Sequence, residues 1–164
     1  MNQSIQNRKA EILLRNRKNK IFEEYDKNKY CKVIDFSKDV AINLYSEYFK
    51  ETIKTNNNFF TSKLQLNGLT SKKDIKNWIL NNILIHTVDN NIINILFGEF
   101  GLRLELVNSE NFFSNELQKK IDSHVGLDYG YINENKYIIQ IFSDEEHYVY
   151  EYLKKWDESN VLIR

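Results

Sequence analysis

Apolar residues recur along the first third of the chain at the spacing of amphipathic helices. Residues 4–27 predict a helix with a weak apolar stripe, because the middle of the segment is mostly basic. A short strand is expected within residues 30–36. Residues 37–54 predict a clear amphipathic helix, with Ser37 as its N-cap, since a serine hydroxyl accepts a hydrogen bond from the first turn.

The middle of the chain changes from helical spacing to strand spacing. Residues 55–68 are polar and predict a loop, which is the best candidate for an internal boundary. Ser71 caps the next predicted helix, which ends near Ile85. The β-branched run 92–97 and the strict alternation in 102–106 then predict two strands of a hairpin with one buried face.

The last part of the chain repeats the order hairpin, helix. A helix is expected over 109–123, after the first hairpin, and a second hairpin over 127–132 and 137–142. The Ser-x-x-Glu pattern of Ser143–Glu146 is a capping box, so a final helix is expected to begin there. Its apolar stripe would be Val149, Tyr152, Leu153 and Trp156.

These elements predict an α+β fold in which N-terminal helices precede a ββαββα unit. Two hairpins that are each followed by a helix favour a mostly antiparallel sheet with helices packed on one face. The length of 164 residues fits a single domain, 1–164. Within it, 1–58 would be a basic helical portion and 70–164 an α+β portion with an acidic surface.

A net charge of zero conceals two oppositely charged halves. Residues 1–80 contain sixteen Lys and Arg against nine Asp and Glu, whereas residues 81–164 contain seven against fourteen. No apolar run is long enough to span a bilayer, and residues 1–20 lack the pattern of a signal peptide. Cys31 is the single cysteine, so no internal disulfide can form. A soluble, cytoplasmic protein without a membrane partner is expected.

The residues that catalysis or metal binding would need are not clustered in the sequence. His86, His124 and His147 form no His-x-x-x-His pair, and the five glycines match no phosphate-binding loop. A nuclease of the Asp…Glu-x-Lys kind is also disfavoured, because the strand that should contain Glu-x-Lys reads Arg103-Leu-Glu105. We therefore expect a protein that is not an enzyme, with no catalytic residue, no cofactor and no metal.

Acidic and aromatic residues are concentrated near the C-terminus. On the predicted final helix, Tyr148 and Tyr150 would point away from the apolar stripe, beside several carboxylates, and tyrosine is good interface material. The acidic run from Ser143 to Tyr150, with the sheet before it, resembles in general character the immunity proteins that neutralise bacterial toxins. The resemblance covers residues 89–158.

This resemblance implies a function and a contact surface. The protein would bind a cognate toxin, often a basic nuclease in such systems, and occlude its active site. The contact residues would be Asp144, Glu145, Tyr148 and Glu151.

An alternative follows from the basic segment at the N-terminus. Its six cations could lie along phosphates and make the chain a nucleic-acid-associated regulatory protein: Arg8, Lys9, Arg15, Arg17, Lys18 and Lys20. The sequence pI near 6.8 and the acidic second half make nucleic acid the less favoured partner at this stage.

Overall fold

The computed structural model describes residues 2–54, 60–67, 69–87, 91–123, 129–133, 137–143 and 148–155. Four helices lie in these ranges: α1 (Asn2–Asp26), α2 (Asp39–Lys54), α3 (Lys72–Ile85) and α4 (Ser109–Asp122). The strands are β1 (Cys31–Phe36), β2 (Phe60–Gln65), β3 (Ile92–Leu96), β4 (Gly101–Leu106), β5 (Tyr129–Asn133), β6 (Tyr137–Ser143) and β7 (Tyr148–Lys155). The protein is therefore α+β.

The strands form one seven-stranded sheet in the order β1-β4-β3-β5-β6-β7-β2. Every pairing between neighbouring strands in it is antiparallel. The two edge strands, β1 and β2, come from the first part of the chain and enclose the strands that follow. The sheet is thus assembled from both ends of the sequence.

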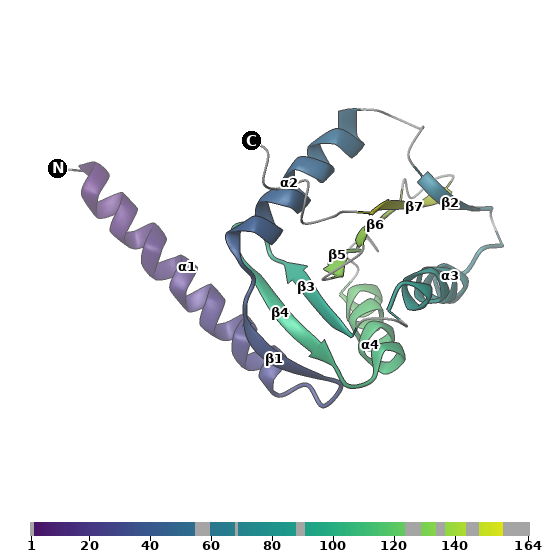
Figure 1. Ribbon diagram of the computed structural model, residues 1–164, viewed down its shortest axis with the longest axis horizontal. Helices are drawn as coiled ribbons and strands as arrows, with labels where there is room; N and C mark the ends of the chain where they lie inside the picture. The colour runs from purple at the N-terminus through teal and green to yellow at the C-terminus, as the bar shows by residue number, and fades with distance from the viewer. Residues whose placement is uncertain are drawn as a thin grey trace.

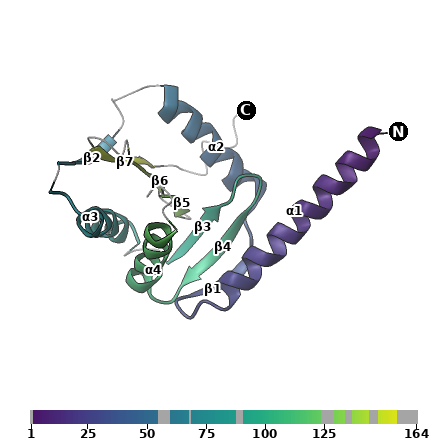
Figure 2. The same ribbon diagram turned by 180° about the vertical axis from the view of Figure 1, so that it is seen from behind.

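Helices α3 and α4 and the C-terminal end of α1 pack on one face of the sheet (Figures 1 and 2). The alternating residues of β4 point into this layer, with Leu102 and Leu104 fully buried. They meet Ile79 and Ile83 of α3 and three residues of α4, which are Phe112, Phe113 and Leu117. Burying one such side chain stabilises the fold by about 1.5–3 kcal/mol.

Helix α2, which precedes the two hairpins in the chain, packs on the opposite face of the sheet. Ile132 of β5 is fully buried against Leu44 and Tyr45 of α2. Its neighbours in the strand, Tyr131 and Asn133, belong to the other face, because successive strand residues alternate. The ring of Tyr45 lies directly over Gly130, where the backbone has no Cβ to keep the helix away.

Several local predictions are confirmed. Ser71 and Asp74 form a full capping box at the start of α3. The strands expected at 92–97 and 102–106 are β3 and β4, and the helix expected at 109–123 is α4. Ser37 is not the cap of α2, because its backbone N–H donates to the carbonyl of Gly101 and its buried hydroxyl has no hydrogen-bond partner among the described residues.

Two predictions of secondary structure were wrong. The segment 55–68, expected to be a loop, contains β2, which pairs with β7 at the sheet edge. The final helix expected from the Ser143–Glu146 capping box is replaced over 148–155 by β7. Every residue of β6 is paired with a residue of β7. The segment is rich in Tyr, Val and Leu, which suit a pleated, half-buried strand, and this pairing outweighs the helical spacing.

Candidate functional site: a projecting basic helix and its buried anchor

Two of the four contact residues that the sequence predicted lie in a strand where a helix was expected. Asp144 and Glu145 lie outside the described residues. Tyr148 and Glu151 both lie in β7, at positions opposite Gln65 and Ser62 of β2. Two residues three positions apart share one face of a helix but belong to opposite faces of a strand. The structure therefore does not bring these positions together on one surface.

The N-terminal half of α1 is exposed to solvent. It projects from the body in both views (Figures 1 and 2). Every residue from Ile5 to Leu13 is exposed, and partial burial begins only at Leu14. Further along, Ile21 and Phe22 pack against the core, and Tyr25 is buried. One end of α1 is thus part of the fold, and the other is outside it.

Large aliphatic side chains lie on the side of α1 that faces away from the body. Ile5 and Ile12 are 54% and 51% exposed, and Leu13 is 69% exposed. A helix has about 3.6 residues per turn, so Ile5, Ile12 and Asn16 fall on one line along its surface. We call these three residues the outward stripe. It lies opposite the line through Lys18 and Tyr25, which contacts the fold.

Two of the six cations on α1 are used by the fold. The guanidinium of Arg17 lies 5.6 Å from the ring centre of Phe100. The ammonium of Lys18 lies 5.5 Å from the ring of Phe36 and 5.6 Å from that of Phe100. These cation–π contacts hold the middle of the helix against the β3–β4 turn.

The other four cations are exposed and border the outward stripe. Arg8 and Arg15 are seven residues apart and lie on one side of it. Lys9 and Lys20 are eleven residues apart, about three turns, and lie on the other side. The projecting helix therefore presents a narrow line of apolar and amide groups between two rows of positive charge.

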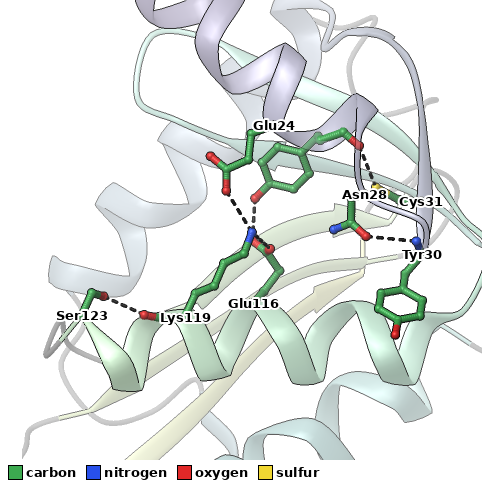
Figure 3. A network of polar contacts seen from close by, with 8 residues as sticks. Glu24, Asn28, Tyr30, Cys31, Glu116, Lys119 and Ser123 are labelled. Carbon is green, nitrogen blue, oxygen red and sulfur yellow. Dashed lines mark hydrogen bonds and ion pairs between the residues drawn. The ribbon is translucent and has the colours of Figure 1, made fainter.

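The base of α1 is fixed to α4 by a polar cluster in which Tyr25 and Glu116 are buried and Glu24 and Lys119 are exposed (Figure 3). The hydroxyl of Tyr25 donates to Oε2 of Glu116 at 2.6 Å. The ammonium of Lys119 donates to Oε1 of Glu116 and to Oε1 of Glu24, both at 2.9 Å. The thiol of Cys31 donates to the carbonyl of Tyr25 at 3.6 Å. We call Glu24, Tyr25, Glu116 and Lys119 the anchor.

The pKa values of Tyr25 and Lys119 in the anchor, and of the neighbouring Cys31, are raised. Burial raises the pKa of Tyr25, and the nearby Tyr129 and Glu116 raise it further. Burial also raises the pKa of Cys31 to about 11, with a smaller contribution from Glu116. Burial alone would lower the pKa of Lys119, but its hydrogen bonds to Glu24 and Glu116 raise it overall. At neutral pH the thiol is protonated, and the cluster serves as a structural tie.

The sequence contained one signal for this anchor. Glu116 lies on the apolar line of α4, four residues after Phe112 and next to Leu117. A carboxylate at such a position is buried when the helix packs, so it needs hydrogen-bond donors from elsewhere in the fold. The partner could not be found from spacing, because Tyr25 is 91 residues away in the chain. The basic helix itself was found, but its projection from the body was not.

The described residues contain neither a metal-binding cluster nor a membrane-spanning helix. No group of three or more His, Cys, Asp or Glu there could hold a metal ion. No helix in the same ranges has the length and apolar character needed to cross a membrane. Of the three histidines only His86 is described, at the C-cap of α3, and its carbonyl accepts from Asn133.

Comparison with known proteins gave no match. No family model, no curated protein and no solved structure is similar enough to this chain to assign it a family or a fold relative.

Proposed function

We propose that this chain is a nucleic-acid-associated binding protein that contacts phosphates with the four exposed cations of α1, which are Arg8, Lys9, Arg15 and Lys20. The observation that supports the proposal is the pair of exposed cation rows on the side of α1 that faces away from the fold. Exposed Lys and Arg on a narrow ridge attract the phosphate backbone, because each contact releases condensed counterions. The acidic second half of the chain would be repelled by phosphates, which favours an approach with α1 foremost.

The positive charge on the outward side of α1 also disfavours two other partners, a second copy of the chain and a basic toxin. A second copy of the chain would bring the same cation rows together, so pairing of two such helices is opposed by like-charge repulsion. A basic toxin would be repelled for the same reason. The immunity role stays a prediction. Of its expected contact residues, Asp144 and Glu145 lie outside the described residues, and for Tyr148 and Glu151 only the backbone is described.

Fluorescence anisotropy with a labelled 20-base-pair DNA duplex tests the proposal. The full chain should bind at micromolar concentration in 50 mM salt. With about four phosphate contacts, the logarithm of the binding constant should fall with the logarithm of salt concentration at a slope of roughly −3.6. The double variant Arg8→Glu/Arg15→Glu should lower the affinity at least tenfold.

The matched control is Lys72→Glu/Lys73→Glu, which changes the charge equally at the start of α3. These two lysines are exposed, and α3 lies on the other side of the molecule from α1 (Figure 1). The control should bind like the unchanged chain. Absence of binding, or an equal loss of affinity in both double variants, would refute the proposal. Binding to vesicles of phosphatidylglycerol but not to nucleic acid would assign α1 to a membrane surface instead.

A further inference from the structure

We infer that the outward stripe of α1 enters the major groove of duplex DNA and contacts the methyl groups of thymine, so that the protein prefers AT-rich duplexes. This inference rests on the proposed function and names the ligand of that same helix. Its starting point is an observation that phosphate contact does not explain: Ile5 and Ile12 are about half exposed between the two cation rows.

The shape of the projecting segment fits this groove. A helix with its side chains is about 10–12 Å wide, and the major groove of B-DNA is about 12 Å wide. From Ile5 to Asn16 the helix spans about 17 Å at 1.5 Å per residue, which corresponds to about five base pairs. The body does not cover the stripe, because Ile5, Ile12 and Asn16 are all exposed.

The chemistry of the stripe fits one kind of base pair. Aliphatic side chains contact the thymine methyl group, which lies in the major groove, and an asparagine amide can pair with N6 and N7 of adenine. Ile5, Ile12 and Asn16 would thus all face A·T pairs. The cation rows on either side would then reach the phosphates of both strands and fix the register of the helix.

Other anionic ligands use this arrangement less well. The major groove of an RNA duplex is deep and narrow and does not admit a helix. A membrane surface needs a broad apolar face, whereas here two isoleucines lie between cations and aromatic residues are missing from the exposed segment 5–16. The thymine methyl is therefore the group that the stripe matches best.

Four duplexes of equal length test the inference by anisotropy: an AT-rich DNA, a GC-rich DNA, the AT-rich DNA with uracil in place of thymine, and the AT-rich sequence as RNA. Uracil removes the methyl group and leaves charge and base pairing unchanged. We expect the AT-rich DNA to bind best. The uracil form should bind about fourfold more weakly for each methyl group that an isoleucine would otherwise cover. The RNA duplex should bind most weakly.

The variant Ile5→Ala/Ile12→Ala separates base contact from phosphate contact. It keeps the helix and its charges, so it should still bind DNA but should no longer distinguish thymine from uracil. Leu13→Ala is the matched control, because Leu13 is exposed beyond the Lys9–Lys20 row, and it should keep the distinction. Asn16→Ala should reduce the preference for AT-rich over GC-rich DNA about tenfold.

The outcomes separate this inference from the proposed function. Equal affinity for the AT-rich, GC-rich and uracil duplexes would overturn the inference and leave phosphate binding by α1 in place. Tighter binding to the RNA duplex would also overturn it. Failure to bind any of the duplexes would refute the proposed function as well.

Discussion

Glu116 is a carboxylate that lies 8% exposed among the aromatic residues of α4. Taking a charged group out of water is costly unless hydrogen bonds replace those to water. Here the hydroxyl of Tyr25 and the ammonium of Lys119 supply the donors, one to each oxygen. Because Tyr25 belongs to α1, satisfying this one side chain fixes the base of the projecting helix.

Replacing Tyr25 by phenylalanine should therefore lower the free energy of unfolding by about 1–3 kcal/mol, since a buried carboxylate oxygen would be left without its donor. The ring contacts with Phe97 and Phe112 would remain. Urea denaturation measures the effect. Tyr30→Phe is the control, because no hydrogen bond of the Tyr30 hydroxyl to a described residue exists and its removal should change stability little. Equal effects of the two variants would show that the Tyr25–Glu116 bond contributes nothing.

Cys31 should react slowly with alkylating reagents, because it is buried. Its side chain is 5% exposed, and its pKa is raised from 9.0 to about 11. At pH 8 the native thiolate population should be about a hundredfold below that of the unfolded chain, and iodoacetamide alkylation should slow at least as much. Because the folded pKa is raised, this thiol lowers stability as pH rises from 9 to 11. Equal alkylation rates in buffer and in urea would contradict the prediction.

At the scale of elements, the position of α2 depends on a glycine in β5. A Cβ on Gly130 would run into the ring of Tyr45. We expect Gly130→Ala to destabilise the fold by about 1–3 kcal/mol, as overpacking usually does. In the Tyr45→Ala background the same substitution should cost much less, and thermal unfolding of the four proteins in this double-mutant cycle measures the coupling. Additive effects would mean that α2 does not rest on β5.

The elements that sequence could predict are those whose signal is local. The Ser71 cap, the alternation of Leu102 to Leu106 and the apolar line of α4 are set by neighbouring residues, and all appear where expected. Strands β2 and β7 could not be found in this way. Their pairing joins Phe60–Gln65 to a segment more than eighty residues later, and Val149, Tyr152 and Trp156 also fit a helical period.

The candidate site, like the fold, could be predicted from the sequence only in part. The cations of α1 are visible in the sequence, and so is their excess over acidic residues. The sequence does not show which of these cations pack on the fold and which stay exposed. Arg17 and Lys18 contact Phe36 and Phe100, and these contacts form only when the chain folds. The outward stripe is defined only once the packed side of the helix is known.

At the scale of the whole molecule, the fold and the binding segment are nearly separable. A seven-stranded sheet with helices on both faces is complete without the first thirteen residues. Those residues contain Arg8, Lys9 and two members of the outward stripe, all exposed. A chain whose net charge is zero can thus present a positive ridge at one end and an acidic surplus elsewhere.

Deleting residues 1–13 should separate stability from binding. The described contacts of α1 with the body begin at Arg17, so the free energy of unfolding should change by less than about 0.5 kcal/mol, as for other surface changes. DNA binding in 50 mM salt should disappear, because half of the cations beside the stripe and both isoleucines are removed. Urea denaturation and anisotropy on one preparation measure the two properties. A fall in stability above about 2 kcal/mol would mean that the segment packs on the body, and unchanged DNA affinity would place the binding surface outside α1.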